Sequence, residues 1–357
     1  MDCFILKKKN IKMFKIGKFK ISKKNKTLII AEIGQSHLGS INNVRSIINK
    51  VSKAGADIIK FQTHLAANES TINEPFRVKN KKFKNRIDYW KQMEFTKKNW
   101  IQIISECNKK NLQFISSPFS DEAVDLLKTL KIKAWKIGSG EFFSNKMIEK
   151  IIEFKQPIII STGLSKMNEI EKIVNKFKKN KVNFILMQCT SLYPSKIRDI
   201  GINILDIFKK KFNCAIGLSD HTGSIYPSIY AMCKGASAIE VHVGDKKEKM
   251  NPDSSSSISF NELKELSRAR DEIYIMRKYK QNKKKLTPRL SQIKKIFTKS
   301  CTVKKKMLKG EILKESDITV KKPGTGVPYE DINLIVGKKL KNDIYPNRLI
   351  KLSDLKK

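Results

Sequence analysis

The sequence has no long hydrophobic run, and we do not expect its first 20 residues to be a signal peptide. Although 40% of its 357 residues are hydrophobic, no stretch of 18 or more consecutive apolar residues occurs, which excludes a typical transmembrane helix. The first 20 residues, MDCFILKKKNIKMFKIGKFK, contain only three consecutive apolar residues before the lysines begin. They lack the apolar core and the small-residue cleavage site of a secretory signal peptide. We therefore expect a cytoplasmic protein without membrane attachment.

Cysteine and arginine are scarce. The six cysteines are irregularly spaced and form no CxxC pair, which argues against a disulfide framework or a zinc site. The formal net charge is +40, but only nine of the 74 basic residues are arginine. Arginine rather than lysine dominates bidentate recognition of bases and phosphates, and the lysines are spread along the chain. We therefore do not expect a nucleic acid partner, although the charge should attract anionic substrates.

Eight short runs rich in isoleucine and valine alternate with amphipathic stretches of helical period. Consecutive apolar positions are typical of strands buried on both faces, as in a parallel sheet. Eight such units over roughly 250 residues indicate a (β/α)8 barrel, or TIM barrel. A doubly wound sheet is the alternative, but no GxGxxG motif follows the first run. The expected strands are Thr27–Ile33, Asp57–Phe61, Leu112–Ser116, Ala134–Ile137, Pro157–Ile160, Val182–Leu186, Cys214–Leu218 and Ala238–Val243.

The expected barrel, residues 27–278, is flanked by other segments. Residues 1–26 are an N-terminal extension, in which FKIGKF is consistent with a hairpin around Gly17. Residues 279–296 begin as a polar, highly charged stretch that is typical of a linker. Over residues 297–357, short β-like runs such as DITVKK alternate with turn signals such as PGTG. This alternation predicts a small β-rich domain.

The chemistry of a TIM barrel takes place at the C-terminal ends of its strands. One connecting loop, between Phe61 and Trp100, is unusually long, as functional loops often are. Lys60 and Lys136 lie within the apolar runs IIKF and AWKI, and a buried lysine without a partner is costly, so we expect an anion beside them. Hydroxyl groups at neighbouring strand ends would complete a phosphate site. These serines are Ser116, Ser117, Ser139, Ser161, Ser191 and Ser219.

Two of the four histidines, His221 and His242, follow the last two expected strands. Adjacent strand ends lie side by side, so the two imidazoles could bind one divalent metal such as Mn, Fe, Co or Zn. Asp220 and Glu240 are close in sequence and would orient the imidazoles. The alternative is that each histidine is a hydrogen-bonded structural residue. Candidates for a general base and a substrate ligand at other strand ends are Glu32 and Glu141.

Together, these motifs resemble those of the sialic acid synthases, which condense phosphoenolpyruvate with an N-acylated amino sugar to give a nine-carbon 2-keto acid. The matching stretches, in family order, are IIAEIGQSHLGS, ADIIKFQTH, FISSPFS, AWKIGSGEF, IISTGLS, QCTSLYP, IGLSDHTGS, IEVHV and NPDSSSS. The tail, TVKKKMLKGEIL followed by DITVKKPGTGV, resembles the family's C-terminal antifreeze-like domain, or SAF domain. The resemblance implies a TIM barrel followed by a small β-rich SAF domain.

The resemblance also implies roles for individual residues. Glu32 would be the catalytic acid/base that handles the attacking water. His221 and His242 would hold a divalent ion, Mn2+ in the best-known members, with Mg2+ or Co2+ as alternatives. The phosphate and carboxylate of phosphoenolpyruvate would be bound by Lys60, Ser117, Lys136, Ser139, Ser161, Ser191 and Ser219. The sugar would be contacted by Gln62, Glu141, Tyr193, Asp253 and Lys322.

In this family the SAF domain of one subunit covers the barrel mouth of another, which implies a domain-swapped homodimer. Three positions depart from the family pattern. Ser36 and Ser191 stand where asparagine is common, and Lys322 stands where the family has an arginine. Lysine keeps the positive charge but loses the planar fork of arginine. The sequence therefore does not choose between N-acetylmannosamine and a 2,4-diacetamido-6-deoxy hexose as the sugar.

Two other functions are compatible with parts of the pattern. A 3-deoxy-ulosonate synthase would use a phosphorylated aldose and would need arginines for the second phosphate, but the motif turns contain none. A basic nucleic-acid-binding protein with an inactive barrel would show steeply salt-dependent binding and would have no need of His221.

Overall fold

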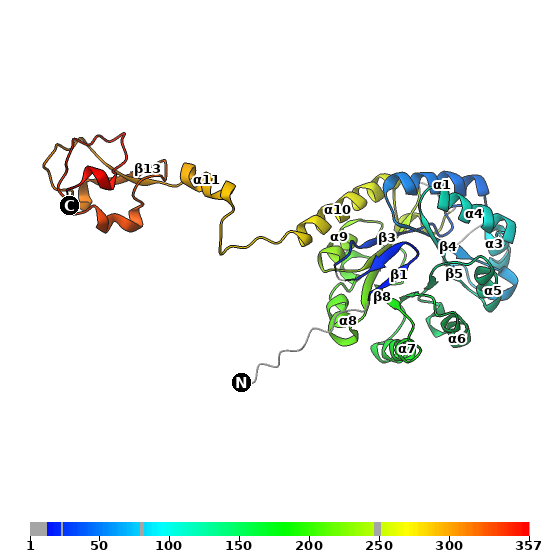
Figure 1. The fold of residues 1–357 in the computed structure, drawn as a ribbon. Coiled ribbons are helices and arrows are strands. Elements are labelled where there is room, and N and C mark those ends of the chain that lie inside the picture. The colour runs from blue at the N-terminus through cyan, green and yellow to red at the C-terminus, as the bar shows by residue number, and fades with distance from the viewer. Residues whose placement is uncertain (1–12, 23, 79–81, 246–250, 357) are drawn as a thin grey trace. The chain divides into compact units, whose positions relative to one another are not determined.

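Eight parallel strands close into a barrel in the computed structural model, which describes residues 13–22, 24–78, 82–245 and 251–356 (Figure 1). The strands follow one another in chain order, and the last closes the barrel by pairing with both its predecessor and the first. The expected TIM barrel is confirmed, because each strand overlaps one of the eight apolar runs. The strands are β3 (Leu28–Glu32), β4 (Ile58–Thr63), β5 (Gln113–Pro118), β6 (Trp135–Ile137), β7 (Ile158–Ser161), β8 (Phe184–Cys189), β9 (Ala215–Asp220) and β10 (Ala238–Val243).

Helices cover the outside of the barrel, because a connection between parallel neighbours must cross a face of the sheet. Six of them coincide with the amphipathic stretches: α1 (Ile41–Ala54), α4 (Lys97–Lys109), α5 (Asp121–Thr129), α6 (Asn145–Glu153), α7 (Met167–Lys179) and α9 (Tyr226–Cys233). Two further helices are α8 (Ile204–Phe212) and α10 (Phe260–Lys278). The long loop after β4 contains two short helices, α2 (Ala66–Glu69) and α3 (Arg86–Met93). A short strand, β11 (Ser257–Ile258), pairs with β10.

The barrel has an apolar core on each side of its strands. The outer core lies between the strands and the helices. The inner core fills the barrel toward the N-terminal ends of the strands and comprises Phe14, Ile16, Ile21, Leu28, Ile30, Ile58, Ile115, Ala134, Ile159, Ile185, Met187, Ala215 and Ala238. The antiparallel hairpin of β1 (Phe14–Ile16) and β2 (Phe19–Ile21) contributes to this inner core, so it closes the bottom of the barrel. Residues 1–12 of the expected N-terminal extension lie outside the described residues.

The chain divides into two compact units, the first ending at Tyr279. The second unit contains a small antiparallel sheet of β12 (Ser300–Val303) and β13 (Ile318–Lys321). Buried residues such as Leu313 and Ile335 form an apolar core of its own. A small β-rich domain therefore follows the barrel, as the sequence pattern indicated.

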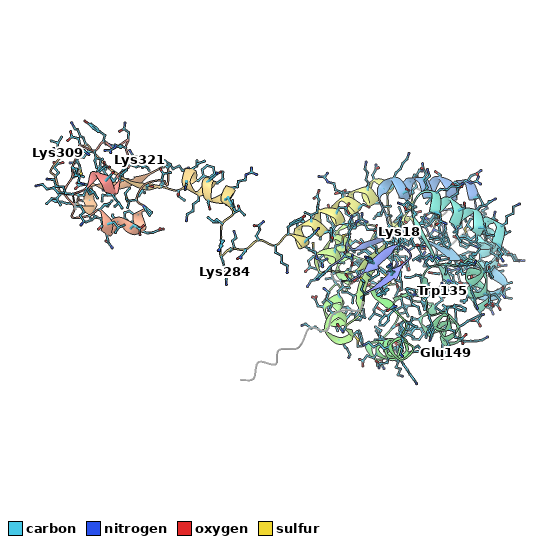
Figure 2. All side chains as sticks on the ribbon, in the orientation of Figure 1. Lys18, Trp135, Glu149, Lys284, Lys309 and Lys321 are labelled. Carbon is cyan, nitrogen blue, oxygen red and sulfur yellow. The ribbon has the colours of Figure 1, made fainter. Side chains whose placement is uncertain are left out.

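The segment expected as a linker, residues 279–296, contains most of a helix, α11 (Pro288–Phe297). Threonine and proline begin this helix, since the side chain of Thr287 accepts a hydrogen bond from the third following backbone N–H. Lysines of the second unit such as Lys309 have solvent-exposed side chains (Figure 2). Among the residues described, no helix is both long and apolar enough to cross a membrane.

Ser120, which precedes the sequence DEAV, caps helix α5. Its side chain accepts a hydrogen bond from the backbone N–H of Ala123 at 3.1 Å. We expect Ser120→Ala to lower the free energy of unfolding by about 1 kcal/mol, because the backbone N–H of Ala123 in the first turn of the helix then loses its side-chain acceptor. Denaturant unfolding measures this change, with Ser120→Asn as the control that keeps a capping group. An alanine variant as stable as the parent would show that the cap contributes nothing.

Candidate active site

The inner surface of the barrel changes from apolar to polar along each strand. Every second residue of a strand points into the barrel, because side chains alternate between the two faces. On β3, Leu28 and Ile30 belong to the inner core, whereas Glu32 lines the cavity above it. On β4, Ile58 belongs to the core and Lys60 to the cavity. The C-terminal ends of the strands therefore surround a polar cavity of about 700 Å³.

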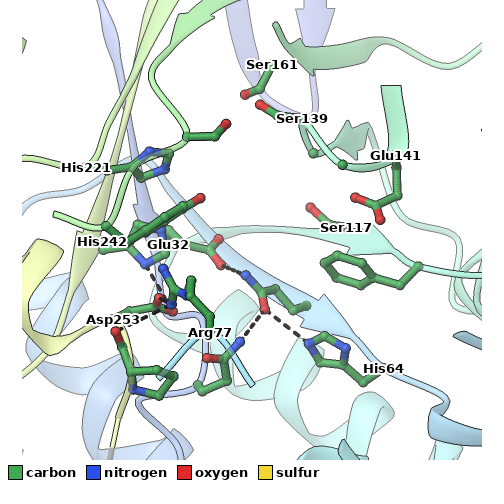
Figure 3. A pocket seen from close by; sticks show the side chains of 18 of the residues that line it. Glu32, His64, Arg77, Ser117, Ser139, Glu141, Ser161, His221, His242 and Asp253 are labelled. Carbon is green, nitrogen blue, oxygen red and sulfur yellow. Dashed lines mark hydrogen bonds and ion pairs between the residues drawn. The ribbon is translucent and has the colours of Figure 1, made fainter. Parts of the chain in front are cut away.

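The structure brings nearly all the expected site residues together in this cavity (Figure 3). The cavity is lined by Glu32, Lys60, Gln62, Ser117, Lys136, Ser139, Glu141, Ser161, Ser191, Tyr193, Ser219, His221, His242 and Asp253. The expected role of Ser116 in the phosphate site is wrong, because Ser116 points away from the cavity that its neighbour Ser117 lines. Its Oγ donates to the carbonyl oxygen of Phe61 at 3.0 Å and lies 2.7 Å from Thr63 Oγ1. Lys322 belongs to the second unit and is exposed there, with its Nζ 5.4 Å from the ring centre of Phe297.

Glu32, Lys60, Lys136 and Glu240 form a buried charge cluster in the cavity. Lys60 Nζ lies 2.5 Å from Glu32 Oε2 and 3.6 Å from Glu240 Oε1. Lys136 Nζ lies 3.3 Å from the same Glu240 oxygen. Burial alone would lower the pKa of Lys60, but the carboxylates of Glu240 and Glu32 outweigh it and raise that pKa. Lys60 is therefore held as a cation inside the barrel, and the ammonium groups of both lysines lie where an anionic ligand could reach them.

The two carboxyl groups of the charge cluster, those of Glu32 and Glu240, have pKa values shifted in opposite directions. Burial is the largest influence on Glu32 and raises its pKa above the ordinary value, against the attraction of Lys60. Burial also disfavours the charged form of Glu240, but Lys136 and Lys60 together hold its pKa well below the ordinary value. Glu240 is therefore a permanent counter-charge, whereas Glu32 is the carboxyl group better suited to exchanging a proton.

Serine hydroxyls lie next to the lysines of the charge cluster. Lys136 Nζ donates a hydrogen bond to Ser161 Oγ at 2.8 Å, and Lys60 Nζ donates to Ser117 Oγ at 3.3 Å. Ser139 Oγ accepts from the backbone N–H of Gly163 at 3.0 Å. Ammonium groups, hydroxyl groups and backbone N–H groups in this arrangement are the usual partners of a phosphate or carboxylate.

His221 and His242 fit the requirements of a metal-binding pair. Their ring centres are 5.2 Å apart. His221 Nδ1 faces the carbonyl oxygen of Thr190 at 2.9 Å. His242 Nδ1 is buried without a hydrogen-bond partner, and the nearest carboxylate oxygen, Asp253 Oδ2, lies 3.6 Å away. His221 thus uses Nδ1 for a carbonyl acceptor, which leaves its Nε2 for an ion, as is usual for metal-binding histidines, whereas Nδ1 of His242 makes no hydrogen bond to the described residues.

The remaining surroundings of the histidine pair are consistent with a catalytic rather than a structural metal. Burial lowers the pKa of His242 to about 3, so its imidazole is in the neutral form that binds metals. Within the described part of the chain, no set of three or more His, Cys, Asp or Glu side chains converges as a metal site. An ion held by the pair would therefore keep positions open for substrate and water.

The expected orienting roles of Asp220 and Glu240 are wrong. Asp220 accepts hydrogen bonds from the N–H and hydroxyl groups of Thr222 in its own loop. Its neighbour Ser219 points into the cavity, so Asp220 must point to the outer face of the sheet. Glu240 does point inward, but it lies beside His242 on the same strand face and contacts Lys136 instead.

A hydrogen-bonded chain connects Glu32 to the long loop after β4 (Figure 3). Gln62 Nε2 donates to Glu32 Oε1 at 2.9 Å, and Gln62 Oε1 accepts from Gln35 Nε2 at 2.9 Å. His64 Nε2 lies 3.1 Å from Gln62 Oε1, and His64 Nδ1 lies 2.7 Å from Glu69 Oε1. These contacts fix the side-chain amide of Gln62, which in turn holds one oxygen of Glu32.

Part of the cavity wall comes from residues outside the sequence motifs. The long loop after β4 contributes Glu69, Glu74, Phe76, Arg77, Val78, Arg86, Tyr89 and Trp90. The unusual length of the loop predicted a functional role, but no local pattern indicated which side chains face inward. Burial raises the pKa of Glu141, which also lines the cavity, to about 7, so near neutral pH this carboxyl group can either donate or accept a hydrogen bond.

Comparison with known proteins identifies the family of both units of the chain. The model of the NeuB family matches residues 47–282, and the SAF domain model matches residues 298–356. An N,N'-diacetyllegionaminic acid synthase of Campylobacter jejuni is 33% identical over 89% of this chain and 98% of its own. A pseudaminic acid synthase of C. jejuni is 32% identical over 96% and 99% of the two chains.

A solved structure shows the same architecture. The N-acetylneuraminic acid synthetase of Leptospira borgpetersenii, crystallised with citrate, has a TM-score of 0.69 and 27% identity, and the match covers 80% of this chain and 96% of that one. The matches span both units of this chain. The chain therefore belongs to the NeuB family, which includes sialic, legionaminic and pseudaminic acid synthases, and carries a SAF domain at its C-terminal end.

Proposed function

We propose that the protein is a nonulosonate synthase, a C–C bond-forming transferase that condenses phosphoenolpyruvate with an N-acylated amino sugar. The observation that carries this proposal is one cavity that holds both the buried charge cluster and the histidine pair. The charge cluster fits the anionic substrate, phosphoenolpyruvate, and the histidine pair fits a metal ion that would bind the carbonyl group of the sugar. Membership of the NeuB family supports the same reaction class.

Phosphoenolpyruvate would lie over the charge cluster. Its phosphate and carboxylate need cations and hydrogen-bond donors, which Lys60 and Lys136 provide together with the neighbouring hydroxyl groups of Ser117 and Ser161. The remaining expected donors, which also line the cavity, are Ser139, Ser191 and Ser219. Both lysines are less than 5% exposed, so their attraction for the anion is weakly screened by salt.

His221 and His242 would hold a divalent ion, Mn2+ by family resemblance and Mg2+ or Co2+ as alternatives. When bound, such an ion supplies Lewis acidity that polarises the aldehyde of the sugar. The chain's own residues position the partners. Gln62, Glu141, Tyr193 and Asp253 line the same cavity and would contact the sugar hydroxyl and amide groups.

The proposed reaction has three bond changes. The electron-rich C3 of phosphoenolpyruvate attacks the aldehyde carbon, and positive charge develops at C2. Glu32 accepts a proton from the water that adds to C2, while the carboxylate of Glu240 stabilises the developing charge. The former aldehyde oxygen takes up a proton and becomes a hydroxyl group. Cleavage of the bond between C2 and the phosphate oxygen then releases phosphate, and loss of the proton from the C2 hydroxyl group leaves the 2-keto acid.

The cavity favours an uncharged sugar over the phosphorylated aldose of a 3-deoxy-ulosonate synthase. Two arginines of the long loop do line the cavity, although the motif turns contain none. Each is already paired with a carboxylate, since Arg77 bonds to Asp253 and Arg86 Nε lies 3.2 Å from Glu74 Oε1. Paired guanidinium groups are poor partners for a second phosphate, because the phosphate would have to displace a carboxylate.

Phosphate release from phosphoenolpyruvate tests the proposal. The assay contains Mn2+ and either N-acetylmannosamine or a 2,4-diacetamido-6-deoxy hexose, with chelator-treated enzyme as the control. We expect metal-dependent release with one of the two sugars, and the productive sugar identifies the acceptor. Release with neither sugar, or release that is unaffected by the chelator, would contradict the proposal.

We also propose, from the family resemblance, a domain-swapped homodimer in which Lys322 of the SAF domain contacts the sugar bound by the partner subunit. Lys322→Ala should then raise the KM for the sugar about tenfold, the effect of losing one charged hydrogen bond, and leave that for phosphoenolpyruvate unchanged. Steady-state kinetics with each substrate varied in turn measures the two constants. Equal changes in both would argue against a contact with the sugar.

A further inference from the structure

We propose that Arg77 is a positioning residue for the acceptor end of the cavity, where its guanidinium group holds Asp253 and Tyr193 in place beside the histidine pair. The inference rests on the proposed function for the identity of the acceptor. It concerns a residue that lies outside the sequence motifs shared with the family.

Arg77 reaches the cavity from the long loop between β4 and α4. It is one of only nine arginines in the chain, and its side chain is 35% exposed. It lines the cavity next to Phe76 and Val78. A partly open position at the rim of the cavity is where a residue can influence the second substrate without contacting the buried charge cluster.

The guanidinium group makes two kinds of contact, with two different loops. Arg77 Nη2 donates to Asp253 Oδ1 and lies 3.4 Å from the carbonyl oxygen of Pro252, both in the loop after β10. The guanidinium carbon also lies 4.1 Å from the ring centre of Tyr193, which follows β8. Pairing with a carboxylate and stacking on an aromatic ring at the same time requires a planar cation, which lysine does not offer.

Both partners of Arg77 contact the histidine pair. The other carboxylate oxygen of Asp253 lies 3.6 Å from the unpartnered Nδ1 of His242. The ring of Tyr193 lies 4.2 Å from that of His221 and 5.8 Å from that of His242, centre to centre. A single side chain of the long loop therefore fixes one neighbour of each histidine.

The electrostatics support this role. The Asp253 side chain is only 4% exposed. Without Arg77 this buried carboxylate would lose its one guanidinium partner, and a buried carboxylate that has lost its cation is expected to move.

The second arginine of the loop provides a contrast. Arg86 pairs with Glu74, and its guanidinium carbon lies 4.9 Å from the ring centre of Trp90. Both partners belong to the same loop, so these contacts stabilise the loop itself. Of the two loop arginines that line the cavity, Arg77 is the one that ties this loop to the residues around the histidine pair.

The test compares Arg77→Ala, Arg77→Lys, Asp253→Asn and the Arg77→Ala/Asp253→Asn double variant. Arg268→Ala is the matched control, because it removes an arginine–carboxylate pair (to Glu272) from the exposed face of α10. Two quantities are measured on each full-length protein: Mn2+ affinity by electron paramagnetic resonance, and KM for each substrate in the phosphate-release assay.

We expect Arg77→Ala to weaken Mn2+ binding roughly tenfold, the usual effect of disturbing the groups around a metal-binding histidine. The KM for the sugar should rise roughly tenfold while that for phosphoenolpyruvate stays within about twofold. Arg77→Lys should restore part of both losses. The double variant should resemble the stronger single variant instead of multiplying the two effects, because both changes break one unit.

Unchanged Mn2+ affinity in Arg77→Ala, or equal changes in the two KM values, would overturn the proposal and leave Arg77 with a structural role only. If the wild-type enzyme turns over neither sugar, the proposed function fails, and the Mn2+ measurements then decide the role of Arg77 alone. If Arg77→Ala does not fold, the test uses Arg77→Lys in its place. A lower Mn2+ affinity and a higher KM for the sugar in Arg77→Lys than in Arg268→Ala would support the proposal, and equal values in the two variants would overturn it.

Discussion

Replacement of His242 by alanine is expected to reduce metal-dependent phosphate release by roughly a thousandfold or more while leaving the barrel folded. A Lewis acid contributes several kcal/mol to such a reaction, and each 1.36 kcal/mol is a factor of ten in rate. His242 belongs to the only close pair of histidine rings that lines the described cavity, 5.2 Å apart. With one ligand left, His221 alone would not retain a divalent ion at ordinary concentrations.

His242 suits this test because its removal should cost little stability. Its Nδ1 has no hydrogen-bond partner, so alanine leaves no buried donor or acceptor newly unpaired at that nitrogen. Asp253, which faces that nitrogen at 3.6 Å, keeps its pairing with Arg77. Circular dichroism and thermal unfolding should therefore show a native barrel, which separates loss of the metal from loss of the fold.

His37→Asn is the matched control for His242→Ala. His37 is also fully buried, but it does not line the cavity. Its Nδ1 accepts a hydrogen bond from the backbone N–H of Gly39 at 3.0 Å, and asparagine can place an acceptor there. Burial lowers the pKa of His37 to about 3, so no charge is removed. Metal-dependent turnover should survive in this control. Wild-type turnover by His242→Ala, or by chelator-treated wild type, would contradict the metal assignment.

The barrel was predictable because its strands are buried on both faces. Strand β7, for example, is a run of isoleucines up to its last residue, Ser161, and its boundaries follow from the polar residues around it. The site was predictable for a related reason. In a parallel barrel all C-terminal strand ends meet at one rim, so Lys60, Lys136 and His242 had to converge although they are far apart in the chain.

What the sequence could not show is the direction of individual side chains. The pairing of Glu240 with the lysines rather than with His242 depends on which residues share the inner face, and a shift of one residue reverses that face. Arg77 was missed because its partners, Asp253 and Tyr193, come from loops more than a hundred residues away in the chain. Such long-range pairing has no periodicity to detect. Helix α11 was missed because charged residues dominate its neighbourhood.

Replacement of Glu32 by glutamine is expected to lower kcat by about 10² to 10⁴, the usual contribution of a general acid or base. The change is conservative in shape. Glu32 Oε1 accepts hydrogen bonds from Gln62 Nε2 at 2.9 Å and from the backbone N–H of Gly34 at 3.1 Å, and a glutamine carbonyl can accept both. What glutamine cannot do is take a proton from water, so the chemical step should be affected far more than the fold.

The same variant should bind phosphoenolpyruvate at least as tightly as the parent. Glu32 Oε2 lies 2.5 Å from Lys60 Nζ, so the parent carboxylate partly neutralises the cation that is proposed to hold the anionic substrate. Removing that negative charge leaves Lys60 with Glu240 alone, 3.6 Å away, and strengthens its attraction for an incoming anion. A variant with reduced kcat and an unchanged or lower Kd for phosphoenolpyruvate is a combination that general misfolding does not produce.

Single-turnover kinetics and isothermal titration with phosphoenolpyruvate measure the two quantities separately. The Lys60→Met variant is the informative comparison, because it removes the cation and should weaken phosphoenolpyruvate binding while Glu32→Gln does not. If Glu32→Gln retains kcat within tenfold of the parent, the proton must be taken by another group. Glu141, which lines the same cavity and has a pKa raised by burial to about 7, would then be the next carboxyl group to replace by glutamine.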